Sequence, residues 1–167
     1  MLELDTYREE DASVILSWID SELSFRKWSA DRYPVYPITP EDMNRFYRSQ
    51  EKKGFFLPLT ARKETEPVGH LVLRFPESDR SVLRFGFVIV DSRIRGRGYG
   101  KQMIRLALRY GFETCNAKKI TIGVFENNEP ALRCYLSAGF HSTGEVNPYP
   151  ILGQTWNCLE LECLSPE

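Results

Sequence analysis

Residues 84–101, RFGFVIVDSRIRGRGYGK, decide how this chain is organised. The apolar run from Phe85 to Val90 is typical of a buried strand, and Asp91 and Ser92 supply a short turn after it. A Gly-rich segment then leads into a helical pattern of apolar residues. The stretch therefore predicts a strand, a glycine turn and a helix in direct succession.

The glycine turn suits an anionic ligand. Gly96, Gly98 and Gly100 let the backbone approach a ligand closely. Unpaired N–H groups and the macrodipole at the start of the helix favour a negative charge there. Four cationic side chains surround the turn: Arg93, Arg95, Arg97 and Lys101. We expect a pyrophosphate cradle.

Two familiar phosphate motifs fit these glycines poorly. In a P-loop the Gly-Lys pair precedes Ser or Thr, but Gln102 follows Gly100-Lys101 here. A dinucleotide fingerprint needs Gly-x-Gly-x-x-Gly in the first strand–helix unit, and this segment lies past mid-chain with a different spacing. A dinucleotide-dependent oxidoreductase is therefore a distant hypothesis.

A second strand–turn–helix unit lies at residues 120–140, ITIGVFENNEPALRCYLSAGF. Residues 120–125 form an apolar, β-branched strand pattern. Asn127 and Asn128 can cap the following helix, Pro130 suits its first turn, and Gly139 ends it. The helix places Ala131, Leu132 and Tyr135 on one face.

Together the two units resemble the GNAT superfamily of N-acetyltransferases. Arg95, Gly98 and Gly100 meet the pattern Arg/Gln-x-x-Gly-x-Gly, which is similar to the coenzyme A pyrophosphate loop of that superfamily. The spacing from Asn128 to Gly139-Phe140 is similar to the element after this loop. The motifs cover about residues 81–140, the cofactor half of the fold; the N-terminal half matches only in its pattern of elements.

The resemblance implies an acetyl-CoA-dependent N-acetyltransferase in which a primary amine attacks directly in a ternary complex, with no metal. Asn128 would bond the pantetheine arm, and Tyr135 would stand near the thioester sulfur as the general acid. The strand that ends at Val88, Ile89 and Val90 would offer backbone groups to the acetyl carbonyl and the pantetheine. The implied coenzyme-binding residues are Val88, Ile89, Val90, Arg95, Gly96, Arg97, Gly98, Tyr99, Gly100, Lys101, Asn128, Ala131 and Tyr135.

Plainer interpretations stay open at each position. Asn128 can be an ordinary N-cap, Tyr135 a core aromatic, and the glycine turn an exposed loop. The whole chain could also be a non-catalytic coenzyme A-binding sensor or interaction module. Arg84 favours that alternative, because it stands where relatives carry a glutamate on the strand before the turn.

Acetyl transfer to an amine poses two proton problems. Proton transfer from a tyrosine to a thiolate is uphill by about 2 kcal/mol in water, and a desolvated site can remove this difference in free energy. A lysine-like amine costs about 4–5 kcal/mol to deprotonate at pH 7, and an α-amine only about 1 kcal/mol. Arg84 cannot serve as the base. Glu126, His70 or a water acting on a low-pKa amine are candidates, whereas an inward Arg84 would suggest a carboxylate or phosphate on the substrate.

Length and pattern predict a single domain over residues 1–167 with a mixed α/β fold of the GNAT type. We expect a mostly antiparallel sheet of about seven strands flanked by about four helices. Helices are expected at 11–21, from 39–40 to 54, after the glycine turn, and at 128–139. Strands are expected at 2–8, 55–62, 68–75, 82–90, 120–125, 140–146 and 155–164.

Composition excludes several classes. A net charge of −1 argues against a broad nucleic-acid surface, and the sequence has no run of 18 apolar residues for a membrane span. The charged start MLELDTYREED lacks a signal-peptide pattern, so we expect a cytoplasmic monomer or homodimer. The spacing of Cys115, Cys134, Cys158 and Cys163 does not suit a metal site and predicts free thiols.

The acceptor is expected to be a small-molecule or peptide amine held by the N-terminal helices and the loop at 144–150. Acids such as Asp31 and Glu145 near these aromatic residues could hold a cationic amine, although the same composition describes any amphipathic loop. The aromatic residues concerned are Phe25, Trp28, Tyr33 and Tyr36.

Overall fold

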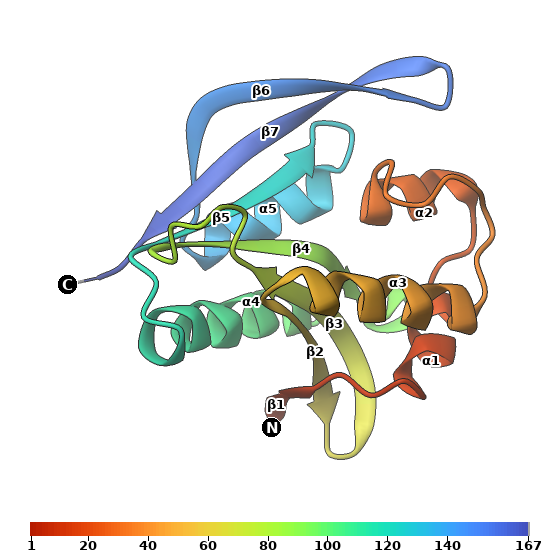
Figure 1. Cartoon of the computed structure of the whole chain (residues 1–167), viewed down its shortest axis with the longest axis horizontal. Coiled ribbons are helices and arrows are strands. Elements are labelled where there is room, and N and C mark those ends of the chain that lie inside the picture. The colour runs from red at the N-terminus through yellow and green to blue at the C-terminus, as the bar shows by residue number, and fades with distance from the viewer. Residues whose placement is uncertain (167) are drawn as a thin grey trace.

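The computed structural model describes residues 1–166 as one seven-stranded sheet with helices on both faces (Figure 1). Strands β4 and β5 pair in parallel, and the other neighbours pair antiparallel, in the order β1-β2-β3-β4-β5-β7-β6. The predicted mixed, mostly antiparallel sheet is confirmed. The strands are β1 (Leu2–Thr6), β2 (Phe56–Lys63), β3 (Glu66–Arg74), β4 (Val82–Val90), β5 (Lys119–Phe125), β6 (His141–Ile151) and β7 (Gln154–Leu164).

The helix count differs from the expectation by one. Within residues 1–166 there are five α-helices: α1 (Asp11–Ser17), α2 (Glu22–Ser29), α3 (Pro40–Lys53), α4 (Tyr99–Arg109) and α5 (Glu129–Ala138). The first helix ends at Ser17, so its predicted extension to Ser21 was wrong. The Ser21 side chain instead accepts a hydrogen bond from the Ser24 amide and begins α2, a helix that the sequence pattern missed.

The predicted loop at residues 144–150 is also corrected, because it belongs to strand β6. This strand pairs with β7 as far as Ile151, after a bulge between Ser142 and Val146. Pro148 and Pro150 are unusual within a strand, since proline cannot donate to a ladder. They are tolerated because β6 is an edge of the sheet and has a partner on one side only. The β6–β7 hairpin curves away from the rest of the sheet (Figure 1).

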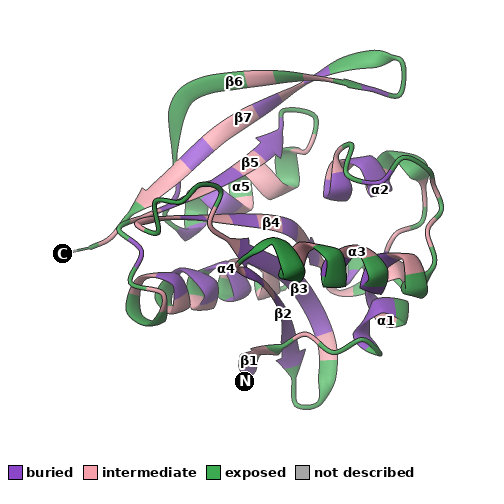
Figure 2. Ribbon diagram, viewed as in Figure 1, coloured by how far each residue is buried: buried purple, intermediate pink, exposed green. Residues whose placement is uncertain are grey.

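Two hydrophobic cores cover the two faces of the sheet, and their buried residues are visible along the strands in Figure 2. On one face α4 and α5 pack against the central strands, and on the other face α1, α2 and α3 do so. The first core includes Leu71, Leu83, Phe85, Met103, Ile104, Ile120 and Tyr135. The second includes Ile15, Phe25, Trp28, Met43, Tyr47, Val72, Phe87 and Ile89.

Strand β4 contains a β-bulge that reverses the face to which its odd-numbered residues point. Residues two apart on a regular strand share a face, yet Phe85 lies in the α4–α5 core and Phe87 in the opposite one. The register against β3 shifts after Gly86, so that two residues of β4 oppose one residue of β3. Phe87 has a φ of 51°, a left-handed conformation that is costly for a bulky side chain.

Gly111 lies where the segment after α4, Tyr110–Thr114, packs closely against the sheet. A Cβ at this position would lie 2.6 Å from Ile120 and 2.9 Å from Leu83. Gly111→Ala should therefore destabilise the protein, because overpacking costs about 1–3 kcal/mol while the gain from replacing glycine in a helix is about 0.5–1 kcal/mol. Denaturant unfolding measures the difference. Gly86→Ala is the control, since a Cβ there meets nothing within 4 Å; equal stability of the two variants would contradict the prediction.

Three further features of residues 1–166 bear on function. No helix in this range has the length and apolarity needed to cross a bilayer. No three His, Cys, Asp or Glu side chains in it converge as metal ligands would. The four cysteines are free, as predicted. Cys158 packs with Phe125 and Trp156, whereas Cys163 packs against the α4–α5 core, so the two thiols lie on opposite faces of β7.

Candidate coenzyme and acyl-transfer site

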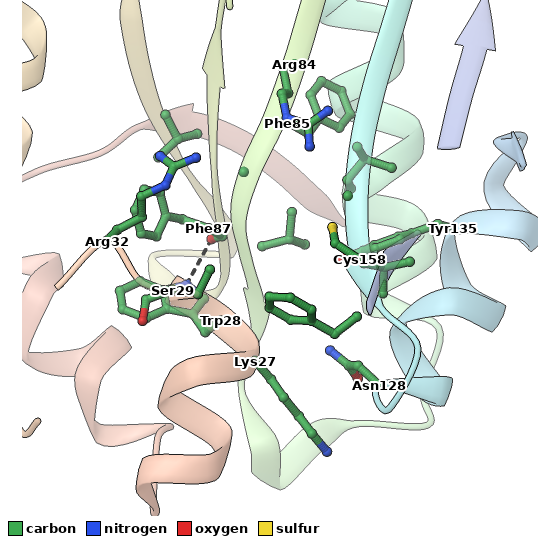
Figure 3. Close-up of a pocket in the computed structure, with 18 of the residues that line it drawn as sticks. Lys27, Trp28, Ser29, Arg32, Arg84, Phe85, Phe87, Asn128, Tyr135 and Cys158 are labelled. Atoms are coloured by element: carbon green, nitrogen blue, oxygen red, sulfur yellow. Dashed lines mark hydrogen bonds between the residues drawn. The ribbon is translucent and has the colours of Figure 1, made fainter. Parts of the chain in front are cut away.

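A groove opens where β4 and β5 stop pairing. The parallel ladder runs from Val82 and Lys119 to Phe85 and Ile122, and no pairing continues beyond it. From there the two strands diverge, and side chains of α2, α5 and β7 close the sides of the opening (Figure 3). We call this opening the β4–β5 groove. Its β4 and β5 lining consists of Arg84, Phe85, Gly86, Phe87, Val88, Ile122, Gly123, Val124 and Phe125.

The predicted phosphate turn lies at the C-terminal end of β4 and has the expected backbone. Gly96 and Gly98 have φ values of 83° and 84°, which favour glycine. Gly98 is the N-cap of α4, and no side chain caps the helix. The first N–H groups of α4 are therefore available to an anion at the start of an 11-residue helix. This backbone fits the diphosphate of coenzyme A.

The side chains around the turn play unequal roles. Arg93 forms an ion pair with Asp91 at 2.8 Å, so the expectation that it serves the turn needs correction. Arg95 and Arg97 are exposed. The Lys63 ammonium donates to the Tyr99 hydroxyl at 2.8 Å, which ties that ring to β2. Phosphate binding would thus rest on backbone amides, Arg95, Arg97 and Lys101.

Gly100 allows the turn to sit close to its neighbours. A Cβ on Gly100 would lie 3.3 Å from the Cys134 sulfur of α5 and 3.5 Å from Val90 of β4. Lys101 lies near enough to Cys134 to act on it electrostatically. The start of α4, the end of β4 and α5 are therefore packed closely together.

Asn128 and Tyr135 both line the β4–β5 groove from α5 and the turn before it (Figure 3). Asn128 occupies the N-cap position, and its carbonyl accepts from the Leu132 amide, but its side chain makes no capping hydrogen bond. The plain capping role of this side chain is thus wrong, and its amide is free for a ligand. Val88 also lines the groove.

Two of the predicted coenzyme residues have side chains directed elsewhere. Ile89 is buried in the core under α1, α2 and α3, so only its backbone could serve a ligand. Ala131 is partly buried against the α4–α5 core. The carbonyl of Phe87 is already engaged, because the Trp28 indole donates to it at 3.0 Å. This bond attaches α2 to the bulge of β4.

Tyr135 is 6% exposed and packs edge-on against Phe140. Burial raises the pKa of the Tyr135 phenol, and the neighbouring Cys134 adds to this shift. The phenol therefore stays protonated at neutral pH, as a proton donor must. The plain interpretation of Tyr135 as a core aromatic is confirmed, and the residue also lines the groove.

Neither candidate base lies in the groove. His70 is fully buried in β3 and contacts the Tyr47 hydroxyl at 2.8 Å. Burial lowers the pKa of His70 to about 3. Glu126 is exposed after β5 and accepts from the Asn157 side chain at 3.0 Å. Among the groove-lining residues that the structure describes there is no carboxylate and no histidine.

Arg84 points into the groove, at the end opposite to the phosphate turn. It forms an ion pair with Glu160 of β7 at 2.8 Å and also donates to Thr121 at 3.2 Å. Gly123 leaves room for this pair, because a Cβ there would lie 2.8 Å from the guanidinium. Arg84 thus replaces the expected acid with a cation that is anchored by an acid from another strand.

The expected acceptor wall is only partly present. Trp28 and Tyr149 line the groove. Phe25 and Tyr33 are instead core residues, 1% and 5% exposed, and Tyr36 packs beside them. The acids Asp31 and Glu145 are not among its lining residues. Sequence reasoning missed the residues that replace them: Lys27, Arg32, Arg74 and Cys158.

Comparison with known proteins identifies the family. The model of the acetyltransferase (GNAT) family matches residues 22–140, so the chain belongs to the GNAT family. It is 31% identical to the spermidine N(1)-acetyltransferase of Escherichia coli K12 over 165 residues, which cover 96% of this chain and 84% of that protein. The spermidine N-acetyltransferase of Vibrio cholerae, solved with CoA and spermine, superposes with a TM-score of 0.81 at 19% identity, covering 98% of this chain and 95% of that one.

A local match is found with the spermine/spermidine N(1)-acetyltransferase of Bacillus subtilis. The two are 36% identical over 58 residues, which cover 35% of this chain and 38% of that protein. The aligned part thus spans well under two thirds of that relative. The likeness to the Vibrio cholerae structure is one of fold, and the resemblance read from the two sequence motifs is confirmed at the level of the family.

Proposed function

We propose that this protein transfers the acetyl group of acetyl-CoA to a primary amine of a small molecule or peptide by direct attack in a ternary complex. The observation that carries the proposal is the combination of the open start of α4, after the C-terminal end of β4, with the β4–β5 groove, which is lined by a buried tyrosine and an uncommitted asparagine amide. The helix start suits the diphosphate, and the groove suits the pantetheine and the thioester. Acetyl-CoA supplies the activated acetyl group.

The phosphate end uses backbone more than side chains. The amides from Gly96 to Lys101 hold the diphosphate, and Arg95 and Arg97 screen its charge from the exposed side. Asn128 orients the pantetheine amide with its free side chain. Unpaired backbone groups of β4 on the β5 side, near Val88, serve the acetyl carbonyl.

Tyr135 moves the proton at the sulfur. The acceptor nitrogen forms the new amide bond and passes its extra proton to water, while the carbon–sulfur bond breaks and the Tyr135 phenol gives its proton to the sulfur. Solvent then returns a proton to the phenolate. Burial raises the pKa of Tyr135, and the same burial raises the pKa of a thiol in the groove, so the transfer stays close to balanced.

The amine needs no carboxylate base in this arrangement. Positive charges near an ammonium group disfavour its charged form and lower its pKa. Lys27, Arg32, Arg74 and Arg84 provide such charges around the groove. Deprotonation to water then supplies the neutral amine, which suits an acceptor of low basicity better than a lysine-like one.

A thermal-shift panel with coenzyme A, acetyl-CoA, NAD and ATP tests the coenzyme part. At 100 times its dissociation constant, a ligand stabilises the folded state by about 2.7 kcal/mol, equivalent to about 5–10 °C for a chain of this size. We expect the shift with coenzyme A and acetyl-CoA only. An equal shift with NAD, or none with coenzyme A, would overturn the proposal.

The second candidate function is a coenzyme A-binding module without turnover. Arg84 favours it, since the expected acid is replaced and its substitute is already paired with Glu160. An amine screen that follows thiol release separates the two functions. Release with at least one amine supports the enzyme, and coenzyme binding with no release from any amine supports the module. Cytoplasmic location and a monomeric or homodimeric state are further parts of the proposal.

A further inference from the structure

The end of the β4–β5 groove away from the phosphate turn is lined by cations from three different segments. Arg32 comes from the turn after α2, Arg74 from β3 and Arg84 from β4, whereas Lys27 lies at the other end of the groove, near Asn128 (Figure 3). We call Arg32, Arg74 and Arg84 the basic rim. No acid is found among the groove-lining residues in the described part of the chain. The rim is separated from the phosphate turn by most of the length of β4.

Arg74 and Arg84 are neighbours because β3 pairs with β4. They are directly opposite each other in the β3–β4 register, and opposite residues in a pair of strands share a face. Arg84 is compensated by Glu160 at 2.8 Å. Two cations, Arg32 and Arg84, act on the charge of Arg74.

The environment of Arg74 is therefore short of negative charge. The residue is only partly accessible, and burial together with Arg32 and Arg84 lowers the pKa of its guanidinium to about 10. Guanidinium groups that are held together in a partly buried place bind carboxylate or phosphate oxygens through two parallel N–H donors. A ligand that brings an anion would remove the repulsion within the rim.

We infer that the acceptor is a primary amine that carries an anionic group, a carboxylate or a phosphate, which the basic rim binds while the amine points toward Tyr135. This inference rests on the proposed acetyltransferase function. It sets the protein apart from relatives named for spermidine, because a polyamine would bring further positive charge to the rim. Trp28 and Tyr149 also line the groove and can hold an apolar part of the acceptor.

Matched acceptors test the inference through kcat/KM measured by thiol release. The pairs are phenylalanine against phenylalaninamide and O-phosphoethanolamine against ethanolamine, with spermidine as the cationic acceptor. In at least one pair the anionic member should react about tenfold better or more, since a charge-assisted bidentate contact is lost in the neutral one. Which pair responds distinguishes a carboxylate from a phosphate. Spermidine reacting faster than every anionic amine would overturn the inference and leave the acetyltransferase proposal standing.

Variants of the rim make the test specific. Arg74→Gln and Arg32→Glu should each lower kcat/KM for the better anionic acceptor about tenfold or more, and Arg32→Glu should raise it for spermidine. Arg109→Gln is the control, because Arg109 is exposed on α4 and lies outside the groove. It should leave kcat/KM unchanged for both the anionic acceptor and spermidine. Arg32 is exposed, so its variant should fold even if Arg74→Gln does not. Equal effects of all three variants would contradict the inference.

If no amine reacts, binding of an acetylated product distinguishes the inference of an anionic acceptor from the acetyltransferase proposal. Protein saturated with coenzyme A is titrated with N-acetylphenylalanine and with its amide, and the thermal shift is recorded. A larger shift with the carboxylate that Arg32→Glu abolishes supports an anionic acceptor site without turnover. No difference between carboxylate and amide, together with no thiol release from any amine, overturns both proposals.

Discussion

Replacement of Tyr135 by phenylalanine should lower kcat by about 10²–10⁴-fold, the usual contribution of a positioned general acid. The substitution removes only the hydroxyl that faces the groove and keeps the ring, including its edge contact with Phe140. The KM for acetyl-CoA should change little, because the phenol acts on the departing sulfur. Thiol release under saturating substrates measures the effect.

Tyr110→Phe is the matched control for this variant. Tyr110 also packs against the α4–α5 core, but it does not line the groove. Its variant should keep full activity. Since burial raises the pKa of Tyr135, wild-type activity should also show no loss through ionisation of this phenol up to about pH 10. A Tyr135→Phe enzyme with wild-type kcat would eliminate the assigned role.

Gly98→Val should raise the KM for acetyl-CoA about 5–150-fold with a much smaller effect on kcat. Gly98 has a φ of 84°, which costs a β-branched residue about 1–3 kcal/mol. The turn can relieve this strain by leaving the conformation that presents the α4 amides. Coenzyme binding must then restore that conformation, and with it the strain. That energy corresponds to the stated range in affinity.

Gly153→Val provides the comparison that isolates coenzyme binding from backbone strain. Gly153 lies in the turn between β6 and β7 with a φ of 73°, and a Cβ there meets nothing within 4 Å. This variant should lose similar stability in thermal unfolding but retain the wild-type KM for acetyl-CoA. If both variants change KM alike, the turn at residues 95–101 is not the phosphate site.

The sequence was informative where function depends on consecutive residues. The strand at residues 82–90, the turn after it and the helix beginning at the next glycines were predicted from one stretch, and all three are present. The Asn128 and Tyr135 spacing also placed both residues correctly in the groove. In each case local backbone chemistry sets the structure, so a short motif contains the necessary information.

What could not be predicted depends on pairing between distant segments. The bulge at Phe87 is defined by the register of β4 against β3, and nothing in the apolar run reveals an extra residue. The basic rim joins residues from positions 32 to 84, each of which looks like an ordinary surface charge alone. Helix α2 was missed because Ser21 begins one helix although it seemed to end another.

The extra residue in β4 has a consequence for how this protein can change. Deleting one amino acid around Phe87 would restore the regular alternation of β4 side chains between the two faces of the sheet. The β4 residues on one side of the deletion would then point into the opposite cores, and the ladder with β5 could continue across the opening. Turns such as the one between β6 and β7 can gain or lose residues with little effect on the centre of the molecule. Strand β4 cannot gain or lose residues in this way, because its one extra amino acid lies where the groove opens beside β5.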